Sequence, residues 1–325
     1  MRKKNIIIIA VLGLLVILVG LSLLAFLGNK TSNNQSVRIY LPEGTSQDAL
    51  IDTLQTHGIL TNGKNTKLFN FQFSIFSSEI LPGSYVVEPG MKTLDLVRRL
   101  KNGQQSPIRL TIGKFRLPQQ LDKYLNEKLM HNDFNIPLDS FYLIRPNTYE
   151  FYWTASPEQF LQRMRKEYDI FWSHRDSTIS IVNCQLSIHD IIVLASIVEE
   201  ETNNNEEKPL IASVYLNRLK RGMPLQADPT VKYAVGDFTL QRILNKHLSV
   251  ESPFNTYLHK GLPPVPICLP SASSVNAVLN APETNYLYFC ASDKMDGTHR
   301  FAATLDEHNR NAAAFHRALN ARGIK

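Results

Sequence analysis

The chain begins with a basic tip that is followed by its longest hydrophobic stretch. Arg2, Lys3 and Lys4 stand before residues 6–27, a run of 22 positions without a charged side chain. At about 1.5 Å per residue, a helix of this length crosses the roughly 30 Å hydrocarbon core of a bilayer. The pattern therefore predicts a membrane-spanning helix.

A cleaved signal peptide is the alternative interpretation of this stretch. Signal peptides carry an apolar region of about 7–15 residues that ends in a cleavage site of small residues. The run here is longer and Ala25-Phe26-Leu27-Gly28 is a poor cleavage site, so residues 1–28 are predicted to stay as a cytoplasmic tip and membrane anchor. Because the basic residues precede the span, we expect a single-pass protein of the cytoplasmic (inner) membrane, with its N-terminus in the cytoplasm and the remainder extracytoplasmic.

After the anchor, polar residues 29–36 predict a short linker, and strand and helix patterns then alternate. Three short segments have the composition of strands, at 37–41, 83–87 and 108–112. Between them, Ser46 and Thr93 stand where a capping residue would open a helix. Residues 37–113 are therefore predicted to form a small α+β module.

The pattern becomes mostly helical from Lys114 onward, and short apolar strands return near the end, for example at 286–290. No internal repeat is visible. Residues 114–325 are predicted to form one larger α+β domain of the size of a catalytic domain. The fold class expected for the whole chain is therefore α+β, with an N-terminal transmembrane helix, a small module and a larger domain.

Charge and cysteine content exclude several classes of protein. The 325 residues include 35 Lys and Arg against 29 Asp and Glu, a net charge of +6 without an extended basic block. This balance does not indicate a nucleic-acid partner, although it suits an anionic surface. Cys184, Cys268 and Cys290 are too few and too widely spaced for a zinc site or a disulfide framework, and we expect them to be buried as small hydrophobic residues.

Three consecutive glutamates end a helix that is predicted to begin after Ser187. One stripe of this helix is apolar, through Ile191, Leu194, Ala195 and Val198. At 100° per residue, Glu200 lies opposite that stripe and is expected in solvent, whereas Glu199 and Glu201 fall at its two borders. A carboxyl group at such a border can have a raised pKa and still meet a ligand. Periodicity leaves Glu199 and Glu201 as equal candidates, beside the alternative of a plain charged helix end.

A second helix, with Pro209 in its first turn, is predicted to end at Gly222. It is followed by proline-bounded loops that combine amide, hydroxyl and aromatic side chains, at 225–230, 252–257 and 261–266. Such groups suit hydroxyl-rich ligands such as sugars, although each loop taken alone is also ordinary turn chemistry.

Several motifs follow one another in a characteristic order. They are Glu199-Glu200-Glu201-Thr202, Asn217-Arg218-Leu219, Leu225-Gln226-Ala227-Asp228-Pro229-Thr230, Ser252-Pro253-Phe254-Asn255-Thr256-Tyr257, Gly261-Leu262-Pro263-Pro264 and Glu307-His308-Asn309. In order and spacing they resemble the endolytic murein transglycosylase family (MltG, YceG-like) over about residues 190–310. The small module, with Gly83-Ser84-Tyr85, resembles the LysM-like domain of that family. The chain departs from the family pattern at Asn147, Val265 and Thr298, where an aspartate and two glycines are usual.

The resemblance implies a catalytic residue and a reaction. In the family pattern Ile-Val-Glu-x-Glu-Thr the glutamate directly before the threonine is the catalytic acid, which corresponds to Glu201. The implied activity is that of an endolytic peptidoglycan lytic transglycosylase. It cleaves the β-1,4 bond between N-acetylmuramic acid (MurNAc) and N-acetylglucosamine (GlcNAc) in nascent glycan strands, leaves 1,6-anhydro-MurNAc ends and terminates strand elongation. One carboxyl group suffices because the sugar's own C6 hydroxyl replaces water, whereas an ordinary glycosidase needs two carboxylates.

Further residues are candidates for roles in the implied reaction. The candidates to bind N-acetyl groups and sugar hydroxyls are Gln226, Asp228, Thr230, Asn255 and Tyr257. Glu199 is a candidate to tune the pKa of the acid. No cofactor and no metal is implied, since His299 and His308 do not have metal-ligand spacing. The partners expected are peptidoglycan glycan strands, the membrane and peptidoglycan synthases, with no nucleic acid.

Two other classes of function stay open from the sequence. A peptidoglycan glycoside hydrolase would use the same acid with a second carboxylate, for which Asp228 is nearest in sequence. A non-catalytic wall-binding scaffold of a synthase complex would need the anchor and the module but not Glu201. The product of cleavage discriminates between the first two, because an anhydro end is one water lighter than a hydrolysed end.

Overall fold

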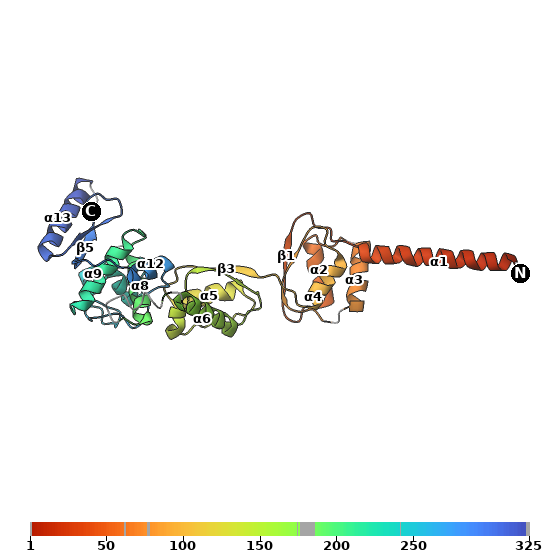
Figure 1. Ribbon diagram of the computed structural model, residues 1–325, viewed down its shortest axis with the longest axis horizontal. Coiled ribbons are helices and arrows are strands. Elements are labelled where there is room, and N and C mark those ends of the chain that lie inside the picture. Colours follow the sequence, from red (N-terminus) through yellow and green to blue (C-terminus); the bar gives the residue numbers. More distant parts are fainter. Residues whose placement is uncertain are drawn as a thin grey trace. The chain divides into compact units, whose positions relative to one another are not determined.

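The chain divides into two compact units (Figure 1). Each unit has its own hydrophobic core. The computed structural model describes residues 2–61, 63–76, 79–173, 175, 186–240 and 242–322. The smaller unit contains the chain up to Leu110 together with residues 128–131 and 150–155, and the larger unit contains the remainder. Cys184 lies outside the described residues, so its predicted burial is not assessed, whereas Cys268 is a buried and Cys290 a half-buried free thiol.

The first helix, α1 (Arg2–Gly28), contains the predicted apolar span. Its window Val11–Gly28 has a mean hydropathy of 2.8, and none of the described side chains in this window is buried. The helix is therefore long and apolar enough to cross a membrane, by length and composition alone. Its insertion and direction stay predictions at this point.

The small unit continues with two strands and three helices. In chain order they are β1 (Val37–Leu41), α2 (Gln47–Thr56), α3 (Lys64–Phe76), β2 (Gly83–Val87) and α4 (Thr93–Lys101). β1 and β2 pair antiparallel, with Ile39 opposite Tyr85, and both side chains join a core supplied also by α2, α3 and α4. The strands at 37–41 and 83–87 and the helix capped by Ser46 are confirmed. The LysM-like character of this module stays a prediction.

Residues 29–36, predicted as a short polar linker, pack against the rest of the small unit. Asn29, Thr31 and Asn33 are buried. The Thr31 backbone N–H donates to the carbonyl of Met91 at 2.8 Å, and the Asn33 side-chain amide donates to the carbonyl of Val87 at 3.0 Å. Asparagine and threonine side chains hydrogen-bond readily to backbone groups. These bonds make the segment a packed part of the small unit, and it connects α1 directly to that unit.

The third predicted strand forms as expected but has an unexpected partner. β3 (Ile108–Ile112) pairs with β4 (Asn147–Phe151) and does not extend the β1–β2 sheet. The alternation of apolar and polar residues predicts that a segment is a strand, but it does not predict which strand pairs with it. The pairing of β3 with β4 therefore could not be predicted from the sequence.

The larger unit is mainly helical. Its elements in chain order are α5 (Pro118–Lys128), the 3-10 helix η1 (Leu138–Leu143), α6 (Pro157–Ser173), α8 (Ile188–Glu201), α9 (Lys208–Lys220), α10 (Asp228–Val235), α11 (Asn245–Leu248), α12 (Ala272–Leu279), β5 (Tyr288–Ala291), β6 (His299–Ala302) and α13 (Leu305–Ala321). β5 and β6 form an antiparallel hairpin, with Tyr288 opposite Ala302, against which α13 packs. Mixed helix and strand content confirms the α+β class.

Helix α8 lies at the centre of this unit, packed against α9 and α12 (Figure 1). The Ser187 hydroxyl accepts a hydrogen bond from the Asp190 backbone N–H, and the Asp190 carboxylate accepts one from the Ser187 N–H, so a capping box opens the helix where it was predicted to begin. Every residue from Ile191 to Val198 is buried. The helix is therefore surrounded by core on all sides, and the prediction of a single apolar stripe with a solvated opposite face is wrong.

Helix α9 follows the predicted boundaries closely. Pro209 stands in its first turn, and Gly222, just after its C-terminal end, has a φ of 62°. This left-handed conformation is available to glycine without strain, and so it turns the chain out of the helix. The two helices thereby bring the end of α8 and the middle of α9 to the same region.

Candidate active site

A pocket of about 190 Å³ lies where α8 ends. Its lining residues come from α8, α9, the start of α10, β5 and two loops, and they are Glu201, Tyr215, Arg218, Leu225, Gln226, Asp228, Tyr257 and Phe289. Of the residues proposed from the sequence, the structure therefore brings Glu201, Gln226, Asp228 and Tyr257 together in one cavity.

Glu201 is the last residue of α8, and its carboxyl group lines the pocket. Oε1 accepts a hydrogen bond of 2.6 Å from the Tyr215 hydroxyl. Burial raises the pKa of Glu201 to about 7, against the lowering effect of the Tyr215 bond and with the negative charge of Asp228 adding to the rise. A carboxyl group with this pKa is both acid and base near neutral pH, which is what a proton-transfer catalyst requires.

Tyr215 of α9 also lines the pocket, although it is not among the site residues proposed from the sequence. Its side chain is buried, and burial together with the neighbouring Glu201 charge raises its pKa well above the ordinary value. The phenol therefore stays protonated and acts as a permanent hydrogen-bond donor to Glu201. The sequence feature that could have indicated this role is a tyrosine at a core position, because a buried tyrosine hydroxyl usually has a polar partner.

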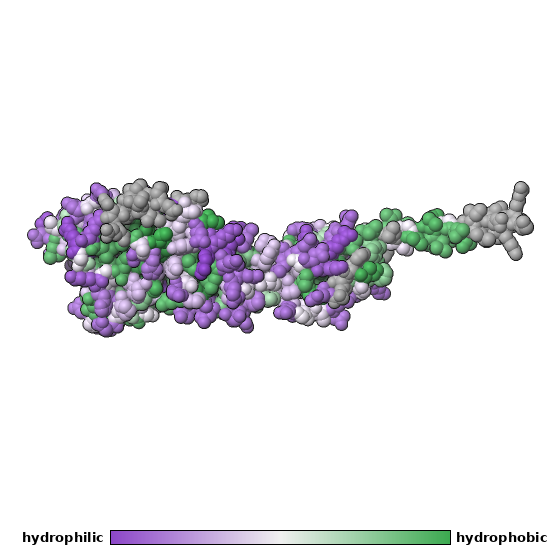
Figure 2. All heavy atoms as spheres, turned by 60° about the horizontal axis from the view of Figure 1, so that its bottom comes forward, coloured by the Kyte–Doolittle hydropathy of each residue, from purple (hydrophilic) through white to green (hydrophobic). Residues whose placement is uncertain are grey.

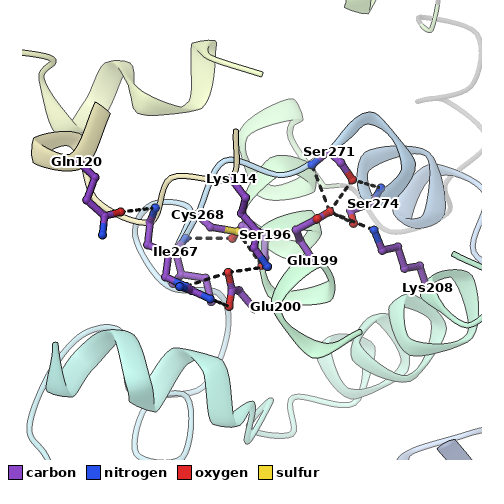
Figure 3. A network of polar contacts seen from close by, with 11 residues as sticks. Lys114, Gln120, Ser196, Glu199, Glu200, Lys208, Ile267, Cys268, Ser271 and Ser274 are labelled. Carbon is purple, nitrogen blue, oxygen red and sulfur yellow. Dashed lines mark hydrogen bonds and ion pairs between the residues drawn. The ribbon is translucent and has the colours of Figure 1, made fainter. Parts of the chain in front are cut away.

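The Glu199 carboxylate is held in a separate network on another side of α8 (Figure 3). Its Oε2 accepts hydrogen bonds from the hydroxyls of Ser271 and Ser274, both at 2.5 Å, and from Lys208 Nζ at 3.2 Å. Although burial opposes ionisation, these bonds and the Lys208 charge lower the pKa of Glu199 below its ordinary value. Glu199 is thus a permanent anion that connects α8 to α9 and α12. No contact among the described residues supports the predicted role of Glu199 in tuning the pKa of Glu201.

The expectation that Glu200 is solvated is wrong. Its side chain is only 12% exposed and forms ion pairs with Arg116 and Lys114. Arg116 binds both carboxylate oxygens, Nε to Oε1 at 3.1 Å and Nη2 to Oε2 at 2.8 Å. Lys114 Nζ lies 3.3 Å from Oε1 of Glu200 (Figure 3). The face of α8 that carries Glu200 was expected to contact water, but the segment 114–116 covers it. The helical pattern of α8 does not predict the position of that segment.

Buried polar contacts hold the loop at 225–228 in shape. The Arg218 guanidinium donates to the carbonyls of Leu225 and Leu287 at 2.8 and 2.7 Å, and to Oε1 of Gln226 at 3.2 Å. Gln226 has a φ of 51°, and its backbone N–H donates to the carbonyl of Thr256. A non-glycine residue in this left-handed region is strained and persists only where its surroundings hold it, a situation common in binding sites.

Thr230 and Asn255, proposed from the sequence as sugar-binding residues, are fully buried and do not line the pocket. The Thr230 hydroxyl donates to the carbonyl of Ala227 at 2.7 Å and contacts the Thr256 hydroxyl at 2.8 Å. Asn255 donates to the carbonyls of Leu248 and Val250. Their polar groups are used in holding the two loops, so they position the pocket wall and the proposal of direct contact with sugar is corrected.

Asp228 and Tyr257 both line the pocket and are hydrogen-bonded to each other. The Tyr257 hydroxyl donates to Oδ1 of Asp228 at 2.7 Å, and Asp228 itself is exposed. This hydroxyl and carboxylate are therefore accessible to a polar ligand. In the described part of the chain, no group of three or more His, Cys, Asp or Glu residues has the arrangement of a metal site.

Comparison with known proteins gives consistent matches. The model of the YceG-like family matches residues 39–314. The chain is 31% identical over 310 residues to the endolytic murein transglycosylase of Bacillus subtilis (strain 168), covering 85% of this chain and 83% of that protein. It is 26% identical over 329 residues to the endolytic murein transglycosylase of Streptococcus pneumoniae (strain D39), covering 87% of this chain but only 59% of that longer protein.

Among solved structures, a crystal structure from Listeria monocytogenes of a protein described as YceG-like is 27% identical to this chain. The match covers 86% of this chain and 99% of the other, with a TM-score of 0.52. The fold of this chain is therefore similar to that structure over most of its length.

The ion pairs of Glu200 predict a structural cost for its replacement. Glu200→Gln leaves Arg116 and Lys114 without their counter-charge, and we expect the free energy of unfolding to fall by about 1–3 kcal/mol. The measurement is denaturant unfolding of the full chain in detergent. Glu206→Gln, at an exposed position in the following turn, is the matched control, with an expected change below about 0.5 kcal/mol. Equal stability of both variants would show that the ion pairs contribute nothing.

Proposed function

The chain belongs to the YceG-like family, and on this premise we propose that it is a peptidoglycan lytic transglycosylase with Glu201 as its catalytic residue. The observation that carries the assignment of the residue is the Glu201 carboxyl group in the pocket wall, with a pKa raised to about 7. The names of the relatives, endolytic murein transglycosylases, supply the reaction and the substrate.

The proposed substrate is a glycan strand of peptidoglycan, cleaved at the β-1,4 bond between MurNAc and GlcNAc. Protonated Glu201 donates its proton to the glycosidic oxygen as the bond from this oxygen to C1 of MurNAc breaks. The resulting carboxylate accepts the proton of the C6 hydroxyl of the same sugar, whose oxygen bonds to C1. The products are a free GlcNAc hydroxyl and a 1,6-anhydro-MurNAc end, no water is consumed, and Glu201 is again protonated.

The surroundings of Glu201 support both halves of this cycle. Burial favours the protonated form that must meet the substrate. The Tyr215 hydroxyl binds Oε1, so it fixes the orientation of the carboxyl group and stabilises the carboxylate that exists between the two proton transfers. Tyr215 thus acts as a positioning residue in the proposed mechanism.

The other groups of the pocket suit a carbohydrate. Gln226, Asp228 and Tyr257 offer an amide, a carboxylate and a hydroxyl, and Phe289 adds an apolar ring. Sugar rings present hydroxyl groups at their edges and C–H groups on their faces, so polar groups beside an aromatic surface match them. We propose Gln226, Asp228 and Tyr257 as the residues that bind the glycan.

A hydrolase is the second candidate, and one observation favours it. Asp228 lines the same pocket as Glu201, so a second carboxylate, which hydrolysis requires, is at hand. Asp228 is, however, already an acceptor for Tyr257, and the relatives are named transglycosylases. The mass of the product decides, because hydrolysis adds one water to the new end.

We also propose that α1 anchors the chain in the cytoplasmic membrane with both units on the extracytoplasmic side. The basic residues before α1 and its uncharged length support this orientation. Peptidoglycan lies on that side of the membrane, so the orientation agrees with the proposed substrate. An interaction with peptidoglycan synthases stays a prediction, which copurification with them from detergent extracts tests.

Replacing Glu201 tests the catalytic assignment. Glu201→Gln keeps the size of the side chain and a hydrogen-bond partner for Tyr215 but has no proton to transfer, so cleavage should slow at least about 10²–10⁴-fold. The measurement is the release of anhydro-ended fragments from purified glycan strands, identified by mass. Glu206→Gln serves as control and should retain wild-type rates. Wild-type turnover by the Glu201 variant would refute the mechanism.

The pH dependence tests the raised pKa. Cleavage needs protonated Glu201, so the rate should be constant well below pH 7, fall to half near pH 7 and decline above it. Asp228→Asn removes a negative charge that raises this pKa, and the midpoint should move to lower pH. Asp306→Asn, at an exposed position of α13, should leave the midpoint unchanged. A midpoint that moves upward in the Asp228 variant would contradict the assigned electrostatics.

Fusion reporters test the topology. An alkaline phosphatase fused after Lys325 should be active, because it folds only outside the cytoplasm, and a cytoplasmic reporter at the same place should be inactive. Replacing Arg2, Lys3 and Lys4 by glutamine is the informative variant, since it removes the charges that set the direction. A fusion active only in the cytoplasm would overturn the proposed orientation.

A further inference from the structure

Helix α3 of the small unit has an apolar face that the core of this unit does not cover. Phe69, Gln72 and Phe73 point inward and are buried. Phe71 and Ile75, four residues apart and therefore on one side of the helix, are 59% and 54% exposed. Large hydrophobic side chains neighbouring each other in this way on a surface indicate an interaction site.

This apolar face of α3 is continuous with the apolar surface of α1. A groove of about 470 Å³ runs between the two helices, and it is lined by Leu15, Leu18, Val19, Ser22, Phe26, Phe71 and Ile75. The rings of Phe26 and Phe71 meet edge to face with their centres 5.9 Å apart. Figure 2 shows the hydrophobic colouring of α1 continuing onto the adjoining surface of the small unit.

Buried hydrogen bonds fix α3 against the end of α1. The Gln72 side-chain amide donates to the carbonyl of Phe26 at 2.6 Å, and its oxygen accepts from the Thr93 hydroxyl at 2.6 Å. Asn29, the first residue after α1, donates to the Thr93 hydroxyl at 3.1 Å. Because Gln72 and Thr93 are completely buried, this junction holds α3 in a defined place beside α1.

The groove therefore lies at the depth of the membrane if α1 spans it. Leu15, Leu18 and Val19 belong to the apolar window Val11–Gly28, and they line the same groove as Phe71 and Ile75. Leaving such a surface in water costs about 25 cal/mol for each Å². Lipid acyl chains, which already surround α1 in the proposed anchoring, are the nearest apolar material to fill it.

Basic residues surround the same end of the small unit. Lys67 lies one turn before Phe71 on α3, and Lys30 and Lys92 face each other in an isolated β-bridge next to the end of α1. All three side chains are exposed. Lysines beside an apolar inserted surface reach to the headgroup region and attract anionic lipids.

We propose that α3 is an interfacial membrane helix, which inserts Phe71 and Ile75 into the bilayer beside α1 and holds anionic headgroups with Lys30, Lys67 and Lys92. The proposal rests on the anchoring of α1 described above. It makes the small unit a lipid-bound base of fixed orientation at the membrane surface.

Lipid-quenching fluorescence of the full chain in nanodiscs tests this. Phe71→Trp and Ile75→Trp place a probe on the apolar face, and the signal of native Trp153 and Trp172 is subtracted with the wild type. Leu18→Trp reports whether α1 is inserted. Glu43→Trp, in the exposed turn after β1 and at the end of that strand away from α1, is the matched control outside the bilayer. The lipids are phosphatidylglycerol and phosphatidylethanolamine brominated near the headgroup end of their acyl chains.

Interfacial helices insert about 5–10 Å into the boundary between headgroups and acyl chains, so we expect brominated lipid to reduce the emission of the probes at 71 and 75 by about half. The probe at 43 should be unaffected, and the probe at 18 should be quenched by lipids brominated deeper in the chain.

Quenching at 18 without quenching at 71 and 75 would overturn the interfacial role and leave the anchor intact. Blue-shifted but unquenched emission at 71 would also overturn it, since a protein surface and not lipid would then cover the groove. Absence of quenching at 18 would overturn the anchoring and this inference together, whereas glycan cleavage, measured separately, tests the catalytic proposal.

Discussion

The larger unit depends on how it accommodates the three carboxyl groups at the end of α8. This helix is buried on all sides from Ile191 to Val198 and ends in Glu199, Glu200 and Glu201. The C-terminal end of a helix is unfavourable for negative charge, and removing a carboxylate from water is costly unless it is paired or neutral. Glu199 is stabilised by Lys208 and two serine hydroxyls, and Glu200 by Arg116 and Lys114. Glu201 accepts a hydrogen bond from the neutral Tyr215 hydroxyl, and because burial outweighs the lowering effect of this bond, its pKa rises to about 7. The same electrostatic problem is solved in three ways, and only the third leaves a transferable proton.

The pocket wall depends on buried polar groups more than on regular secondary structure. The Arg218 guanidinium and the hydroxyls of Thr230 and Thr256 bond to backbone groups of the loops around 225–230 and 252–257. These contacts hold Gln226 in a left-handed conformation. Removing one partner of such a buried bond leaves the other unsatisfied, at a cost of about 1–3 kcal/mol. The arrangement explains why motif residues that never line the pocket are still needed for its shape.

In the small unit, the polar residues after α1 have a similar function. Asn29, Gln72 and Thr93 form hydrogen bonds out of water and join α1 to the module without a flexible connection. A membrane helix attached in this way would transmit its orientation to the module, whereas a polar linker would allow free rotation. The same hydrogen bonds hold the apolar face of α3 beside α1.

The sequence by itself determined the features that depend on neighbouring residues. Local pattern predicted the strands at 37–41, 83–87 and 108–112, the start of a helix after Ser187, the boundaries of α9 and the apolar helix at the N-terminus. All of these agree with the structure. The ordered motifs were sufficient to indicate the family, which the comparisons confirm. The assignment of Glu201 as the acid came from that resemblance, because helical periodicity left it equal to Glu199.

Only the tertiary structure decided the environment of each side chain. Periodicity describes a helix against one core, so it placed Glu200 in water, whereas Arg116, 84 positions earlier in the chain, covers it. Thr230 and Asn255 have the composition of ligand-binding residues but are enclosed by loops that the sequence does not bring together. Tyr215 has the pattern of a core residue, yet its hydroxyl meets a carboxyl group on another helix. Contacts between distant segments set burial and charge, and burial and charge set the pKa that makes Glu201 a proton donor.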